Sequence, residues 1–137
     1  MRYILTLDNT DGLPAWFISS FDKKHALEDA QEAVGGYIEF VNLYTDLTDM
    51  GIDCWVNEEG KFLDLPVTIF NHDDGCLHET ILGNICFLRH GKGDLSGLTK
   101  NDIKYIVESK FKDVEDVVVE GYIFDWILEG KHIHYYE

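Results

Sequence analysis

Basic residues and cysteines are scarce in this 137-residue sequence, and long apolar runs are missing from it. The three cysteines, Cys54, Cys76 and Cys86, are odd in number and lack C-x-x-C spacing, which argues against a secreted disulfide framework. The first apolar run meets a charge at Asp8, too early for a signal peptide, and no run approaches the ~20 residues that span a bilayer. We therefore expect a soluble, cytoplasmic protein with reduced thiols and no membrane partner.

The shortage of bases leaves the chain strongly negative. Twenty-six acids stand against eleven lysines and arginines, for a formal net charge of −15 at pH 7. Such a chain repels nucleic acid and attracts basic surfaces and cations. The charge is also segregated: residues 26–87 hold thirteen acids and one base, Lys61, and residues 113–130 hold six acids and no base. This distribution predicts an extended surface of one sign.

The apolar content, 45% hydrophobic and 13% aromatic, is sufficient for one folded domain over residues 1–137. Residues 26–34 predict an amphipathic helix, with Asp22 as the N-cap of the segment that enters it. A Thr-Lys-Asn-Asp capping box that starts at Thr99 predicts a second helix over residues 103–111. No linker, internal repeat or low-complexity segment divides the chain.

The remaining segments predict strands. Residues 3–7 and 13–20, separated by turn formers, predict an N-terminal hairpin. Residues 122–128 and 132–136 predict a C-terminal hairpin, with a helix over 122–128 as the alternative. Further strand segments are predicted at 37–43, 52–63 (strand, turn, strand), 65–70 and 81–89, the last buried and central. Because the order lacks regular βαβ alternation, we predict an α+β fold: a mainly antiparallel sheet, two principal helices packed on it, and hairpins at both ends.

Catalytic and cofactor motifs are not recognisable. There is no G-x-S-x-G motif, and no local signature ties a cysteine to a histidine. The glycine loop at residues 91–97 lacks the G-K-[ST] of a phosphate-binding loop, and the His, Cys and acidic residues of 72–79 match no zinc spacing. We predict no catalytic residue, metal or cofactor, and not an enzyme; a metal-dependent enzyme stays as an open alternative.

Four ordered landmarks carry a family resemblance. They are Val34-Gly-Gly-Tyr-Ile-Glu39, Asn57-Glu-Glu-Gly-Lys61 followed by Leu65-Pro66, Leu82-Gly-Asn84, and Leu98-Thr99. Over about residues 25–105 the chain resembles an uncharacterised domain-of-unknown-function family of bacteria, plasmids and phages, which implies a mobile-element setting and no assigned activity. In addition, residues 12–17 are similar to the N-terminal region of ArdA-type antirestriction proteins, which are acidic mimics of DNA.

Together these observations predict a binding protein of phage or plasmid type. We expect it to inhibit a host defence or DNA-binding protein by occupying its basic nucleic-acid-binding surface as a partial DNA mimic, without itself contacting nucleic acid. The predicted contact residues are Glu28, Asp29, Glu32, Asp46, Asp49, Asp53, Glu58 and Glu59. The alternative is a small-ligand binder or sponge for a nucleotide signal, with a site formed by Trp16, Trp55, Arg89, Lys92 and Trp126. A homodimer through the aromatic tail or an edge strand stays open.

Overall fold

The computed structural model describes residues 1–60, 63–70, 80–91 and 93–136. The elements, in chain order, are β1 (Tyr3–Asp8), β2 (Ala15–Ser20), the 3₁₀ helix η1 (Lys23–His25), α1 (Ala26–Val34), β3 (Ile38–Val41), α2 (Thr45–Asp49), β4 (Ile52–Asn57), β5 (Val67–Phe70), β6 (Thr80–Leu82), β7 (Ile85–His90), β8 (Leu95–Ser96), α3 (Lys100–Ser109), β9 (Asp116–Glu120) and β10 (His132–Tyr136).

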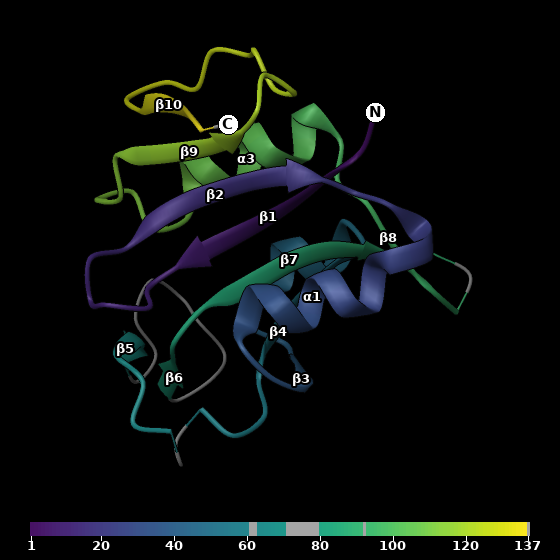
Figure 1. The fold of residues 1–137 in the computed structure, drawn as a ribbon, viewed down its shortest axis with the longest axis vertical. Helices are drawn as coiled ribbons and strands as arrows, with labels where there is room; N and C mark the ends of the chain where they lie inside the picture. The colour runs from purple at the N-terminus through teal and green to yellow at the C-terminus, as the bar shows by residue number, and fades with distance from the viewer. Residues whose placement is uncertain (61–62, 71–79, 92, 137) are drawn as a thin grey trace.

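One eight-stranded sheet forms the centre of the protein. Its strand order is β10-β9-β2-β1-β7-β4-β3, with β8 paired to β7, and β5 and β6 form a separate pair (Figure 1). The pairs β2–β9 and β9–β10 are parallel, and the other pairs between named strands are antiparallel. The predicted α+β fold with a mainly antiparallel sheet is therefore confirmed.

Both predicted helices form, and local capping explains where α3 and the 3₁₀ helix before α1 begin. Asp22 caps η1 by accepting a hydrogen bond from the Lys24 N–H, and α1 follows directly. The capping box of α3 is complete: the Thr99 hydroxyl accepts from the Asp102 N–H at 3.1 Å, and the Asp102 carboxylate accepts from the Thr99 N–H at 2.9 Å. Two orphan donors at the start of α3 are thus satisfied by neighbouring side chains.

The strand predictions have mixed outcomes. The N-terminal hairpin is confirmed, because β1 pairs with β2 along its whole length. The predicted strand over 81–89 is instead two strands, β6 and β7, because Gly83 turns the chain between them with a φ of +81°. The second half of the strand pair predicted over 52–63 includes residues 61–62, which lie outside the described residues.

The predicted C-terminal hairpin is wrong. Residues 122–128 form neither a strand nor a helix, and β10 pairs in parallel with β9 instead of folding back on residues 122–128. The reason is that Phe124 and Leu128 are buried in the main core, so residues 121–131 cross from the end of β9 to the start of β10 over one face of the sheet. We call this segment the crossover. A parallel neighbour requires such a connection.

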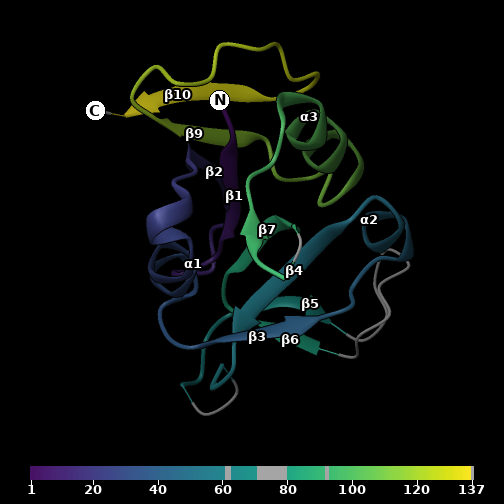
Figure 2. The same cartoon turned by 90° about the vertical axis from the view of Figure 1, so that its right-hand side faces the viewer.

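The helices lie on opposite faces of the sheet (Figure 2). On the α3 face, α2, α3 and the crossover cover the main core, to which the sheet contributes residues such as Leu5, Trp16 and Phe87. On the α1 face, Ala30 and Val34 of α1 pack in a smaller core with sheet residues. Because successive side chains of a strand point to opposite faces of the sheet, β1 contributes to both cores. Tyr3, Leu5 and Leu7 lie in the main core and Ile4 in the smaller one.

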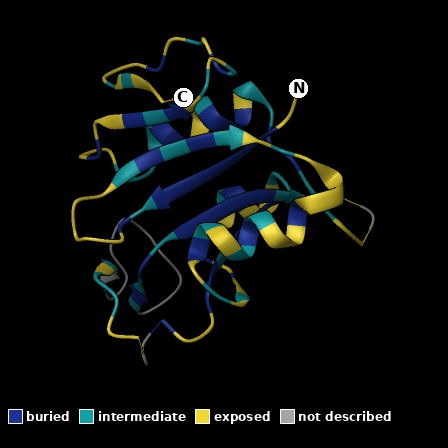
Figure 3. Cartoon of the chain, viewed as in Figure 1, coloured by how far each residue is buried: buried dark blue, intermediate teal, exposed yellow. Residues whose placement is uncertain are grey.

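Helix α1 covers only part of its face. It packs against β3, β4, β7 and β8 and helps to bury Ile4 of β1, and within the described ranges no helix covers the α1 face of β2 and β9 (Figure 1). The outward side of α1 is exposed (Figure 3). The α1 face of the sheet is therefore half open beside an acidic helix.

Candidate binding groove

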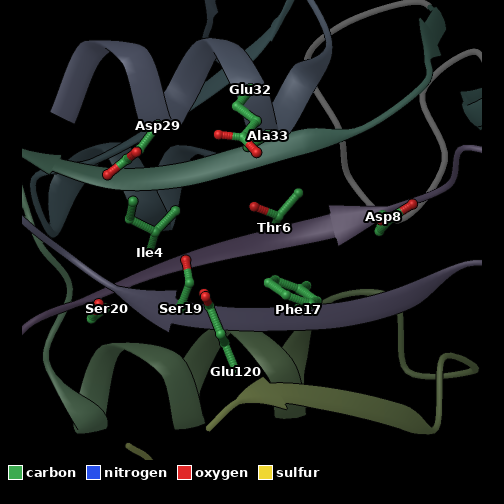
Figure 4. Close-up of a pocket in the computed structure, with 10 residues that line it drawn as sticks. All are labelled: Ile4, Thr6, Asp8, Phe17, Ser19, Ser20, Asp29, Glu32, Ala33 and Glu120. Carbon is green, nitrogen blue, oxygen red and sulfur yellow. The ribbon is translucent and has the colours of Figure 1, made fainter. Parts of the chain in front are cut away.

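A groove of about 450 Å³ lies between α1 and the open part of the sheet (Figure 4). Carboxylates surround it from three elements: Asp29 and Glu32 on α1, Asp8 at the end of β1, and Glu120 at the end of β9. The sheet residues between them are apolar or carry hydroxyls, including Ile4, Thr6, Phe17 and Ser19. The groove thus combines an apolar and hydroxyl-bearing base with carboxylates around it.

Strand register explains how these side chains come to share one face. Thr6 is paired with Phe17, Phe17 with Val118, and Val118 with His134, so these residues form one row across β1, β2, β9 and β10. Glu120 lies two residues beyond Val118 and so points to the same face. Two acids that are distant in sequence, Asp8 and Glu120, therefore line the same groove as the acids of α1.

The position of α1 beside the sheet is fixed by side chains at its last turn. The Asn57 side chain donates a hydrogen bond to the carbonyl of Val34 at 3.2 Å, and the Asn84 side chain donates to the carbonyl of Ala33 at 2.9 Å. These bonds satisfy carbonyls that a helix leaves without an intrahelical partner. Gly36 is required by close approach, since a Cβ there would lie 2.8 Å from the Asn57 amide nitrogen. Three of the four landmarks therefore serve to hold α1.

Lysines and arginines form ion pairs with acids on the opposite side of the sheet. In the described part of the chain, each ion pair of a lysine or arginine includes a residue of α3 or its C-cap; these pairs are Arg89–Asp102, Lys100–Asp125, Lys104–Glu108 and Lys110–Asp46. By contrast, the described residues that line the groove include no lysine, arginine or histidine. The segregation of charge along the sequence thus becomes a difference between two faces of the sheet.

The carboxylates of α1 lack a strong cationic partner. Burial raises the pKa of Asp29, the charge of His25 partly opposes this shift, and three neighbouring acids add to it. His25 lies 3.8 Å from the Glu28 carboxylate, and both side chains are well exposed. The negative charge of α1 is therefore available to a cation from outside the protein.

The eight predicted contact acids do not share one face. Glu28, Asp29 and Glu32 lie on α1, and Glu58 and Glu59 follow β4, with Glu59 beside the C-terminal end of α1. Asp53, on β4, is mostly buried and contacts the His90 ring at 3.0 Å. Asp46 and Asp49 lie on α2, across the sheet from α1 (Figure 2).

Asp46 is also engaged within the protein. Its carboxylate accepts hydrogen bonds from the Tyr105 hydroxyl at 2.5 Å and from Lys110 at 2.8 Å. Burial raises the pKa of Asp46, but these two hydrogen bonds, the charge of Lys110 and the hydrogen bond from the Leu47 backbone together lower it overall. This carboxylate joins α2 to α3.

The residues of the alternative ligand site are not gathered around one cavity among the described residues. Trp16 is 0% exposed and contacts the rings of Phe87 and Phe111 in the main core. Arg89 donates hydrogen bonds to Asp102 and to the Met50 carbonyl. Trp55 packs edge-on against the Phe40 ring, Trp126 packs on the main core from the crossover, and Lys92 lies outside the described residues. Small-ligand binding stays a prediction.

Histidines, cysteines and acids are the residues that could bind a metal or act as nucleophiles. The cluster at residues 72–79 lies outside the described residues, and among those described no group of three or more His, Cys, Asp or Glu side chains is placed to hold a metal ion. Burial raises the pKa of the Cys86 thiol to about 12, so this thiol is not a nucleophile at neutral pH. His132 and His134 share a side of β10, and His134 contacts Asp116 at 3.1 Å.

A membrane-spanning helix is not found among the residues that the structure describes.

Sequence reasoning missed Asp8 and Glu120 as site residues. The alternation of Glu120 with Val117 and Val119 was visible, and it places Glu120 on the face opposite the buried valines. No local signal showed that β9 pairs with β2 or that this face is left open. The sequence therefore predicted the acids of α1 but not the groove beside them.

Comparison with known proteins identifies a family without an assigned activity. No curated protein and no solved structure matches the chain. The similarity of residues 12–17 to ArdA-type proteins is therefore not confirmed. The family match covers residues 1–112, so β9, the crossover and β10 lie beyond it, although Glu120 lines the groove. Through residues 1–112, the chain belongs to the family of domains of unknown function described as DUF3846.

Proposed function

We propose that this protein acts by binding a basic surface of a partner protein through its α1 face. By occupying that surface as a partial mimic of DNA, it inhibits a host defence protein or another DNA-binding protein. The mobile-element setting that the family resemblance implies makes a host defence protein the target we favour. The proposal concerns binding and requires no reaction.

One observation carries the proposal: the carboxylates of the α1 face have no lysine or arginine partner among the described residues, whereas four carboxylates on the side of α3 do. An ion pair within the protein weakens the negative potential outside it, whereas a carboxylate without a cationic partner contributes its full charge to that potential. An unbalanced negative face attracts a basic partner from a distance and raises its association rate, most strongly at low salt. A protein surface built to bind phosphates is such a partner.

The test is capture from a bacterial lysate on immobilised protein, followed by competition. We expect a DNA-binding protein to be retained, to be displaced by duplex DNA, and to be released as salt rises. Neutralising α1 with Glu28→Gln/Asp29→Asn/Glu32→Gln should weaken binding by about ten- to a hundredfold, since each exposed charge pair contributes up to about 1 kcal/mol. The matched control, Asp113→Asn/Glu115→Gln/Glu129→Gln, changes the net charge equally at exposed acids outside the groove and should have much less effect.

Two results would contradict the proposal. One is a captured protein that duplex DNA does not displace, since a mimic and DNA compete for the same surface. The other is an equal loss of binding in the α1 variant and its control, since net charge alone would then explain the interaction.

A further inference from the structure

The open half of the α1 face has the composition of a docking surface. Phe17 and Val118 are half-buried neighbours in the row that crosses β1, β2, β9 and β10. Acids lie on both sides of this row: Asp8 and Asp116 toward one end of the strands and Glu120 toward the other. A half-buried apolar centre with acidic margins is unusual for a face that contacts only water.

The groove beside this row suits one type of side chain. Lysine and arginine have apolar stems that pack on apolar surface while the charged end reaches polar groups. The Phe17 ring offers a surface for such a stem or for a planar guanidinium, and carboxylates offer the fork-shaped acceptor that arginine binds with two hydrogen bonds. Asp29 and Glu32 lie across the groove from Glu120 (Figure 4), so the charged end would meet carboxylates from two walls.

Size and charge limit the occupant. A groove of about 450 Å³ accommodates one or two long side chains but not a folded element. A second copy of this chain is disfavoured, because each copy carries a net charge of −15 and the groove margins are themselves acidic. The occupant is therefore a single basic segment that inserts a side chain.

We propose that this groove receives an arginine side chain from a basic segment of a partner protein, held between the α1 carboxylates and Glu120 over the Phe17 ring. This inference rests on the proposed function and names the group that the α1 face recognises. It also assigns a role to the segment after residue 112: β9 lies beyond the family match and supplies the second acidic wall of the groove.

The test uses fluorescence anisotropy of a labelled ten-residue peptide of alternating arginine and glycine, with a lysine and glycine peptide for comparison. The groove variant is Asp29→Asn/Glu120→Gln. The control variant is Glu39→Gln/Asp113→Asn, which changes the net charge by the same amount at exposed acids that do not line the groove. We expect the groove variant to weaken arginine-peptide binding at least tenfold and the control variant to weaken it less than twofold.

A third variant tests the ring. Phe17→Leu keeps an apolar side chain but removes the aromatic face, so the preference for the arginine peptide over the lysine peptide should fall at least threefold. Urea midpoints of all variants establish that each is folded at the assay temperature. Glu120→Gln alone, at an exposed position, gives the same test if the double variant is unfolded.

Each outcome has a consequence. Equal weakening by the groove and control variants would overturn the inference, although the proposed function would stand if the α1 variant still lost its captured partner. Failure of the wild-type protein to bind either peptide at low salt would count against both. Spermine should be tested as a competitor of the peptide. If it competes at stoichiometric concentration, and if this competition also depends on Asp29 and Glu120, the ligand is a free polyamine, and the inference of a partner protein is overturned. Groove-dependent binding with an arginine preference supports the inference.

Discussion

Replacing Arg89 with alanine should destabilise the fold and leave a buried carboxylate without its partner. The Arg89 guanidinium donates to the two Asp102 oxygens at 2.7 and 2.8 Å, and to the Met50 carbonyl at 2.6 Å. It therefore joins β7 to the first turn of α3 and to the C-terminal end of α2. Burial raises the pKa of Asp102, but the bonds from Arg89 and from the Thr99 backbone outweigh burial and lower it overall.

The size of the effect follows from the unequal burial of the two partners. The Asp102 side chain is 5% exposed and the Arg89 side chain 29% exposed. Removing one partner of a buried pair costs about 3–5 kcal/mol, because the other charge stays buried. The Thr99 bonds to Asp102 persist in Arg89→Ala and water reaches part of the site, so we expect the lower end, about 3 kcal/mol. With an m value of about 2 kcal/mol/M, the urea midpoint should fall by about 1.5 M.

Equilibrium unfolding in urea at pH 7, followed by tryptophan fluorescence and circular dichroism, measures this change. The control is Lys104→Ala, which removes a partly exposed i,i+4 pair with Glu108 on the same helix and should cost only about 0.3–0.5 kcal/mol. The double variant Arg89→Ala/Asp102→Asn should be more stable than the sum of the single effects predicts, since no charge is then stranded. A midpoint for Arg89→Ala equal to that of the control would refute the reasoning. Arg89 would then be free to bind a nucleotide, as the alternative ligand site requires.

Three further expectations follow from the same contacts. Asn84→Ala should cost about 2 kcal/mol in urea unfolding, because it strands the Ala33 carbonyl, whereas Asn101→Ala at an exposed position of α3 should have little effect; equal midpoints for the two would contradict this account. Phe124→Ala should lower the free energy of unfolding by about 3–5 kcal/mol, measured by thermal unfolding, because residues beyond 112 belong to the same core. A loss below about 1 kcal/mol would show that they do not. Acid should destabilise the protein below about pH 4, because the folded-state pKa values of four carboxylates are lowered, those of Asp46, Asp102, Glu108 and Asp125. Their contribution is complete above the unfolded values of 3.8 for aspartate and 4.5 for glutamate and is lost as pH falls through the folded values. The pKa of Asp29 is raised, so its contribution changes with pH in the opposite direction, and a urea midpoint that stays constant from pH 7 to pH 3 would contradict the net effect of the four lowered pKa values.

The elements that the sequence predicted correctly are those whose determinants lie within a few residues of one another. The capping box of α3 involves Thr99 and Asp102, which are three positions apart. The N-terminal hairpin follows from two apolar segments and the turn formers between them. The amphipathic pattern of α1 likewise places Ala30 and Val34 inward on consecutive turns. Local stereochemistry and periodicity are sufficient for such elements.

The sequence misled where the same local pattern permits two structures. Residues 122–128 carry aromatic and β-branched residues typical of a strand, yet two of them, Phe124 and Leu128, are buried as a crossover. Likewise, an aromatic residue and an arginine suggest a ligand site, whereas Trp16 fills the core and Arg89 binds Asp102. In both cases the contact that fixes the side chain comes from another part of the chain. The Phe124 ring packs against Tyr3, and the Arg89 guanidinium pairs with Asp102 of α3.

The charge of this protein is a property of its sequence, and the location of that charge is a property of its fold. The sequence determined a surplus of fifteen negative charges, their separation from the bases near α3, and the two principal helices, α1 and the capped α3. Only the tertiary structure decided that α2 and α3 share one face of the sheet, that their acids meet lysines there, and that Asp29 and Glu120 meet across a groove. These two carboxylates are ninety-one positions apart, and the pairing of β9 with β2 brings them together through backbone hydrogen bonds that no local pattern encodes.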